Sequence, residues 1–176
     1  MLSEEVQDSS EICPACDEDN SRRLPRYGKV YGRYVCRKCY FGFANRRQFA
    51  YLIDVILLVI LRSLVDWTRG IGFWEIEPFN LQSALISLAM TLLLLIKDGF
   101  NGHSPGKALL GVLVLDDRTG EPAGFWASFK RNLPLLIPLV WIVVAFQLVK
   151  GHRWGDKWSH TKVVWKKYKD KPPFAG

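Results

Sequence analysis

The sequence predicts an α-helical integral membrane protein with a small β module at its N-terminus. Three observations lead to this fold class. Apolar runs recur at residues 49–65, 81–96 and 133–149 of a 176-residue chain. Basic residues flank the first run, as they do at the cytoplasmic ends of membrane helices. Four cysteines in two close pairs precede it, in a stretch whose Pro, Gly, Tyr and Val residues are typical of short strands and turns.

The apolar runs predict two or three membrane helices. Run 81–96 rises about 24 Å, short of a hydrocarbon core of about 30 Å unless its ends extend into the flanks. Run 133–149 contains Pro134 and Pro138, which favour a broken or re-entrant segment. A re-entrant run returns the basic tail to the cytoplasm, whereas a straight third helix would place it outside, against the positive-inside rule.

A small cytoplasmic β pairing follows from the re-entrant alternative. The sequence ALLGVLVLDDRTGEP at 108–122 resembles the arm of a hairpin with its turn at 117–120. TKVVW at 161–165 also reads as a strand, and it could pair with GVLVLD at 111–116. The two segments can pair only if the tail returns to the side of the loop. Residues 125–131 between them are amphipathic.

Charge predicts the location of the protein. The chain has 24 Lys and Arg against 17 Asp and Glu, and seven of the acids fall in the first twenty residues. Residues 22–47 hold nine Lys and Arg, which predicts a cytoplasmic N-terminus in a multi-pass protein of the cell membrane. The anionic cytoplasmic leaflet is the expected partner, and nucleic acid is a weaker alternative. Because no signal peptide precedes the first run, that run should be an uncleaved anchor.

The cysteines carry the most specific motif. Cys13 and Cys16 form one C-x2-C pair, and Cys36 and Cys39 form a second after nineteen residues. Four thiolates supply the tetrahedral cage that zinc prefers, and a closed shell of this kind is structural. The spacing does not exclude iron. We therefore expect an acidic disordered tail at 1–12, a zinc ribbon at 13–42, a membrane domain at 45–168 and a disordered tail at 169–176.

Asp54 is the second candidate site residue, because it lies inside the first apolar run. A carboxylate at this depth costs about 2.5 to 3.5 kcal/mol, so it should face protein or water. Arg47 precedes it by seven residues and falls on the same helical face. The expected partners are Arg47, Arg62 or a polar stripe on the second helix; a purely structural salt bridge is the alternative.

The polar stripe consists of Ser83, Ser87, Thr91 and Asp98, which recur on one side of run 81–96 and its extension. For the hydroxyl residues alone, a packing seam between helices is the simpler interpretation. HSPGK at 103–107 does not match a phosphate-binding loop, since Ala108 replaces the required Ser or Thr. A turn that orients the loop suffices. No nucleophile–base pair or open metal site can be assembled, so an enzyme is not expected.

Four segments of the chain stand out in their order and spacing: NRRQFAYLID (45–54), IKDGFNGHSPGKALLGVLVLD (96–116), FKRNLPLL (129–136) and RWGDKWSHTKVV (153–164). In these segments the chain resembles the RDD family of small bacterial membrane proteins. The tail reads WGDKWSHT, where relatives more often have HD-x-x-A-x-T, so Gly155 and Ser159 are departures from the family pattern.

The resemblance assigns family positions to particular residues. The family is named for an arginine at the start of the first helix and two aspartates. Arg46 or Arg47 matches the arginine, Asp54 the first aspartate, and Asp98 or Asp156 the second. It implies a bacterial inner-membrane protein suspected of transporting ions or small solutes, with a zinc ribbon added to the family core.

Two functions of different classes are expected. In the first, Asp54, supported by Arg47, Ser87 and Thr91, forms a polar intramembrane site that transports an ion or small solute. So few helices imply a homo-oligomer or a protein partner. In the second, the protein is a membrane-embedded adaptor or assembly factor whose zinc ribbon docks a cytoplasmic protein, and Asp54 only locks the helices together. A membrane-tethered nucleic-acid binder is a weaker third reading.

Overall fold

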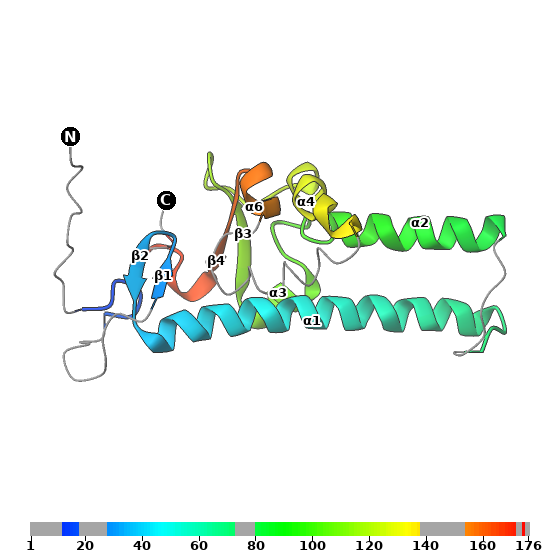
Figure 1. Ribbon diagram of the computed structural model, residues 1–176, viewed down its shortest axis with the longest axis horizontal. Helices are drawn as coiled ribbons and strands as arrows, with labels where there is room; N and C mark the ends of the chain where they lie inside the picture. Colours follow the sequence, from blue (N-terminus) through cyan, green and yellow to red (C-terminus); the bar gives the residue numbers. More distant parts are fainter. Residues whose placement is uncertain (1–11, 18–27, 73–79, 138–153, 172–173, 175–176) are drawn as a thin grey trace.

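The structure is a computed structural model that describes residues 12–17, 28–72, 80–137, 154–171 and 174. One long helix, α1, runs along the whole molecule, and a second helix, α2, lies beside its C-terminal half (Figure 1). Short strands and helices gather beside its N-terminal half. In chain order the elements are β1 (Gly28–Val30), β2 (Arg33–Val35), α1 (Arg37–Thr68), α2 (Leu81–Ile96), α3 (Pro105–Leu110), β3 (Val112–Asp116), α4 (Phe125–Asn132), the 3-10 helix η1 (Leu133–Leu136), α6 (Trp154–Trp158), β4 (Thr161–Trp165) and the 3-10 helix η2 (Lys166–Tyr168).

Helices α1 and α2 form the apolar, helical half of the molecule. Among the described helices, α1 alone is long and apolar enough to cross a bilayer. Helix α2 has the bounds that the sequence predicts, and a capping box of Asn80 and Ser83 starts it. Its 16 residues fall short of a full crossing, so the number of membrane helices stays a prediction. Large apolar side chains remain exposed along both helices, among them Phe49, Leu52, Ile56, Ile60, Leu85, Leu88 and Leu92.

Strands β3 and β4 form the predicted pairing. They run antiparallel in a register that joins Val112 to Trp165 and Asp116 to Thr161. The predicted turn at 117–120 is also present, because the Gly120 N–H donates to the Asp116 carbonyl at 2.9 Å. Strand β3 precedes the third apolar run and β4 follows it, so described segments from before and after that run lie in the same part of the molecule.

The third apolar run is described only at its start. Residues 133–136 form η1, in which Pro134 is buried. Ile137 is also described, and residues 138–149 of the run, which include Pro138, lie outside the described residues. The predicted acidic tail lies outside them too, apart from Ile12.

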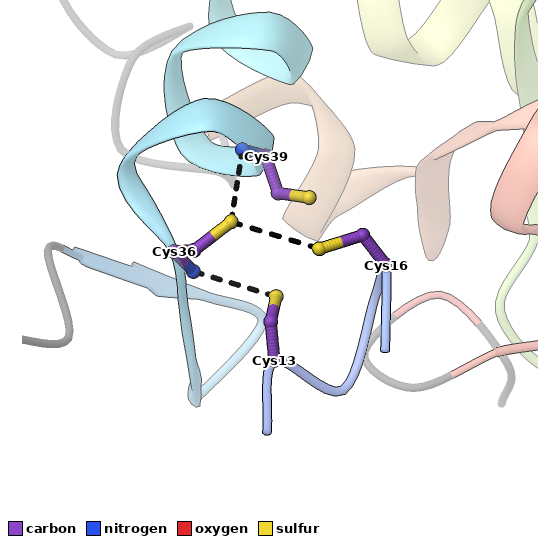
Figure 2. A group of neighbouring side chains, drawn as sticks. All are labelled: Cys13, Cys16, Cys36 and Cys39. Atoms are coloured by element: carbon purple, nitrogen blue, oxygen red, sulfur yellow. Dashed lines mark hydrogen bonds between the residues drawn. The ribbon is translucent and has the colours of Figure 1, made fainter. Parts of the chain in front are cut away.

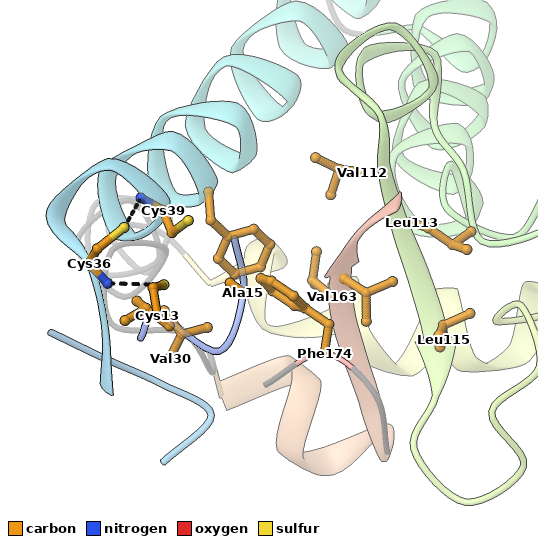
Figure 3. Close-up of a cluster of buried hydrophobic side chains, with 13 residues drawn as sticks. Cys13, Ala15, Val30, Cys36, Cys39, Val112, Leu113, Leu115, Val163 and Phe174 are labelled. Carbon is orange, nitrogen blue, oxygen red and sulfur yellow. Dashed lines mark hydrogen bonds between the residues drawn. The ribbon is translucent and has the colours of Figure 1, made fainter. Parts of the chain in front are cut away.

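The cysteine module and the β3–β4 sheet share one hydrophobic core (Figure 3). Val30 and Val35 from the β1–β2 hairpin pack in the same cluster as Phe43 of α1 and Val163 of β4. Phe174 completes it with a ring 4.9 Å from that of Phe43. This differs from the expected disordered tail at 169–176, because an aromatic side chain gains more from burial here than its ordering costs.

The module is joined to the rest by a helix and not by a linker. Cys36 caps the N-terminus of α1, and Cys39 lies in its first turn. Tyr31, at the tip of the β1–β2 hairpin, donates its hydroxyl to the Val163 carbonyl at 2.5 Å and accepts from the Val163 N–H at 3.2 Å. The boundary expected near residues 42–45 therefore falls inside α1.

Candidate functional site

The four cysteines lie together at the N-terminal end of α1, as their spacing predicts (Figure 2). Their sulfur atoms all lie within 4.8 Å of one another, and none forms a disulfide. The Sγ atoms of Cys16 and Cys36 are 3.8 Å apart. A tetrahedral site with metal–sulfur bonds of about 2.3 Å separates its sulfurs by about 3.8 Å. The four residues thus fit a tetrahedral metal ion.

Backbone N–H groups orient the sulfurs. The Cys36 N–H donates to the Cys13 sulfur at 3.4 Å, and the Cys39 N–H donates to the Cys36 sulfur at 3.5 Å. Burial opposes ionisation of Cys13, but N–H donors, led by that of Cys36, hold the pKa of its thiol below the ordinary value. Donors of this kind stabilise thiolate ligands, so the module is preorganised for a metal.

Seven charged residues lie together where α1, α2, α3, α4 and α6 meet, and we call them the charge cluster. Each side chain is less than a tenth exposed. Three carboxylates face four cations, so opposite charges compensate one another almost completely, as burial requires. The members are Arg47, Asp54, Lys97, Asp98, Lys107, Arg131 and Asp156.

Asp54 joins three elements. Its Oδ2 atom accepts from the Ser104 hydroxyl at 2.7 Å and lies 2.5 Å from the Lys97 amino group. Its Oδ1 atom accepts from the Gly106 N–H at 2.8 Å. Ser104 is the N-cap of α3, so the carboxylate holds the start of that helix against α1, while Lys97 holds the end of α2. Both oxygens of Asp54 are engaged.

Close packing of α3 on α1 depends on Gly106. A Cβ atom at this position would lie 2.2 Å from the Ala50 carbonyl oxygen and 2.9 Å from Asp54 Oδ1. HSPGK therefore acts as a helix start at a close backbone approach, in agreement with the predicted orienting turn. Gly155 has a similar role in α6, because a Cβ there would lie 1.9 Å from the Arg131 carbonyl oxygen. Gly155, one of the two departures from the family tail motif, thus allows close packing of α6 against α4.

Asp98 and Asp156 share a partner in Arg131. The Arg131 Nε atom lies 2.8 Å from Asp156, and its Nη1 atom lies 3.8 Å from Asp98. Arg47 pairs with the second oxygen of Asp156 at 3.3 Å, and Lys107 pairs with Asp98. Both candidates for the second family aspartate therefore belong to one network, which ties the tail helix α6 to α1.

Helix α4 also caps the end of α2. The Ser128 hydroxyl and the Asn132 side-chain amide both donate to the Leu95 carbonyl at 3.0 Å. The Asp98 N–H donates to Ser128 Oγ at 3.1 Å. The first two bonds satisfy a carbonyl that the last turn of a helix leaves without an intrahelical partner.

The predicted partners of Asp54 are wrong. Arg47 pairs with Asp156, and Arg62 pairs with Asp66 at 2.8 Å in its own helix. The polar stripe on α2 does not assemble as one site either. Ser83 caps the helix, Ser87 accepts from Arg62 at 3.5 Å, Thr91 donates to the Ser87 carbonyl, and Asp98 alone joins the charge cluster.

These predictions failed because the residues of the stripe are close in the sequence, whereas the charge cluster joins residues that are far apart in it. Arg46 also lies outside the cluster: it donates to the Leu110 carbonyl at 2.7 Å, and its guanidinium lies 4.8 Å from the centre of the Trp165 ring.

The predicted site residues do not include Lys97, Lys107 or Arg131. A basic residue beside an apolar run is expected at lipid headgroups, so its type alone does not predict a buried ion pair.

One comparison with known proteins identifies the family of this chain. Searches of curated proteins and of solved structures gave no match. The model of the RDD family matches residues 41–160, which begin in α1 just after Cys39 and end just before β4. The matched region contains the whole charge cluster and leaves the four cysteines outside. Because the match covers more than half of the chain, this membrane-associated protein belongs to the RDD family.

Proposed function

We propose that this protein is a membrane-embedded adaptor of the cytoplasmic membrane, in which a metal centre fixes a docking face for a cytoplasmic protein. The shared core of the cysteine module and the β3–β4 sheet carries this proposal. A module that begins α1 and packs on β4 cannot reorient freely against the membrane helices. A partner held there is held at a fixed position relative to the bilayer.

The docking face consists of Lys29, Arg33, Tyr34 and Arg37, all exposed on the β1–β2 hairpin and the first turn of α1. The Lys29 amino group lies 4.7 Å from the centre of the Tyr34 ring, and the Arg37 guanidinium lies 5.8 Å from that of Phe41. Cations beside aromatic rings suit an acidic segment with apolar side chains.

Distance favours a protein over lipid at this face. Phe49 is the first exposed apolar side chain of α1. Arg37 precedes it by twelve residues, which is about 18 Å along a helix. With the N-terminus in the cytoplasm, as the basic residues of 22–47 favour, the face lies well beyond the lipid headgroups.

Zinc is the metal we propose for the four cysteines, because an all-thiolate tetrahedral shell suits it and leaves no position for a substrate. The purified protein should contain one zinc ion per chain by elemental analysis. Chelation should increase hydrogen exchange in residues 28–43 and leave α2 unchanged, since the metal supplies folding energy locally. If the protein contains iron in place of zinc, only the identity of the metal in this proposal is wrong. Unchanged hydrogen exchange after chelation would contradict a structural role of the metal.

A charge-reversal experiment tests the adaptor function. Arg33→Glu with Arg37→Glu should abolish cross-linking of a cytoplasmic partner to the full chain in cells. Lys166→Glu with Lys167→Glu is the matched control, with the same change in charge at exposed lysines of η2. The control and Asp54→Asn should both retain the partner. Equal capture by the docking-face and control variants would contradict the proposal.

Ion or solute transport at Asp54 is the second candidate function, with the protein acting as an oligomer. Its supporting observation is the pair of Asp54 and Lys97, in which an external cation could replace the amino group. Flux of sodium or protons into proteoliposomes should then fall in Asp54→Asn. Equal flux in both proteins would exclude Asp54 from transport and leave its role as a clamp.

A further inference from the structure

Helix α4 has two unlike faces. Its inner face carries Ser128, Arg131 and Asn132, which are all buried against α2 and the charge cluster. Its outer face carries Phe125 and Trp126, with 50% and 68% of their surfaces exposed, and Lys130. Eight residues with this division form an amphipathic helix.

Exposed apolar residues continue past α4. Leu133 in η1 and Ile137 after it are 39% and 58% exposed. We call these two residues, together with Phe125, Trp126 and Lys130, the interfacial face. Four large apolar side chains exposed in so short a segment are unusual against water.

The position of α4 links this face to the surface of α2. Ser128 and Asn132 bind the carbonyl of Leu95, so α4 lies across the C-terminal end of α2 (Figure 1). Leu92 and Leu93, within one turn of that end, are 45% and 40% exposed. Helix α4 therefore lies next to exposed apolar side chains at the end of α2.

The chemistry of the face suits the level of the lipid headgroups. The rings of Trp126 and Phe129 stack at 5.5 Å, and the Lys130 amino group lies 5.4 Å from the centre of the Trp126 ring. Tryptophan prefers this level because its ring is amphipathic, and a lysine there attracts anionic phosphates.

We propose that α4 is an interfacial helix, lying in the headgroup layer where its Trp126–Lys130 pair binds an anionic phospholipid. This proposal is independent of the adaptor function. It makes α4 a lipid-contacting brace that joins the end of α2 to the charge cluster through Arg131.

Two tryptophans with equal exposure allow a direct test. Trp126 of α4 and Trp158 of α6 are each 68% exposed. The full chain is labelled with 5-fluorotryptophan and placed in nanodiscs that contain phosphatidylglycerol. The variants Trp126→Phe and Trp158→Phe assign the two fluorine signals. A spin label on the lipid headgroup should broaden the Trp126 signal, and a water-soluble gadolinium chelate should broaden that of Trp158.

Two outcomes would overturn the proposal. Broadening of the Trp126 signal by the aqueous chelate, to the extent found for Trp158, would place α4 in water. Broadening by neither reagent would mean that protein covers the face, either residues of this chain or a second copy.

A charge substitution tests the anionic lipid. Lys130→Gln should reduce retention of phosphatidylglycerol in native mass spectrometry about fivefold, because one lysine at an anionic surface contributes about 1 kcal/mol. Lys157→Gln, at an exposed lysine of α6, is the matched control and should retain the lipid. Equal retention of phosphatidylglycerol by both variants would contradict a phospholipid site at Lys130.

Discussion

Asp54 of α1 binds both the start of α3 and the end of α2. Its carboxylate accepts from a hydroxyl and a backbone N–H at the start of α3 and pairs with an amino group at the end of α2. A buried carboxylate with this set of partners acts first as a clamp. The loss of stability when this carboxylate is replaced depends mainly on the uncompensated charge that is left on Lys97.

We therefore expect Asp54→Asn to lower the free energy of unfolding by about 3 to 5 kcal/mol, because Lys97 loses its counterion. Titration with SDS in mixed micelles measures this. Asp66→Asn is the control, since the half-exposed pair of Asp66 with Arg62 contributes about 1 kcal/mol or less.

A second substitution separates the charge effect from other losses. Adding Lys97→Gln to Asp54→Asn removes the uncompensated charge, so it should recover part of the stability. If the double variant is no more stable than Asp54→Asn, the pair does not control the stability of this region.

Tyr31 makes the corresponding contact for the cysteine module. Its hydroxyl exchanges two hydrogen bonds with the backbone of Val163, and burial raises its pKa to about 12. Tyr31→Phe should cost about 1 kcal/mol at neutral pH through the lost hydrogen bonds. Thermal unfolding followed by circular dichroism measures the loss.

The pKa of Tyr31 also predicts a dependence on pH. Because its value in the folded protein exceeds the ordinary value of 10, the stability it contributes is complete below about pH 10 and is lost as the pH rises through about 12. Tyr31→Phe should lack this part of the alkaline loss. Parallel loss of stability in both proteins between pH 10 and 12 would contradict the assignment.

At the scale of elements, α3 packs on α1 through a close backbone approach at Gly106. Gly106→Ala should destabilise the protein by about 1 to 3 kcal/mol, since the added methyl group meets the Ala50 backbone and cannot be accommodated by a side-chain rotation. Faster proteolysis in the loop around α3 would report the displacement.

Gly124→Ala provides the matched control for this substitution. A Cβ atom at Gly124 meets nothing within 4 Å, and its φ of −82° is accessible to alanine. Its stability and cleavage pattern should match those of the parent. If the two variants behave alike, close packing at Gly106 is not what holds α3 on α1.

Elements were predicted well where local pattern determines them. The run 81–96 gave both ends of α2, and the pairing of β3 with β4 follows from two short apolar segments. The hairpin arm was only partly correct, because its first residues belong to α3 and capping by Ser104 starts a helix there. A six-residue helix has too few turns for its periodicity to be recognised.

At the scale of the whole molecule, the two sheets constrain the topology. The β1–β2 hairpin packs in the same core as β3 and β4, and Phe174 near the C-terminus lies in that core. We therefore expect both ends of the described chain on one side of the membrane. A third run that crossed the bilayer once would separate β4 from β3.

We accordingly expect tags at the N- and C-termini to be cleaved by protease from the same side of sealed membrane vesicles. Inverted vesicles should expose both tags, because the basic flank of α1 favours a cytoplasmic N-terminus. A tag at residue 75, in the connector between α1 and α2, serves as the control and should show the opposite accessibility. Opposite accessibility of the two terminal tags would contradict the shared core.

The sequence by itself determined the apolar helices, the strand segments and the four cysteines, because each depends on periodicity or spacing between near neighbours. Only the tertiary structure decided which charges meet. Asp54 is 43 residues from Lys97, and Asp156 is 109 residues from Arg47. Such pairs form because burial makes an uncompensated charge costly, and no local pattern specifies which distant cation supplies the compensation.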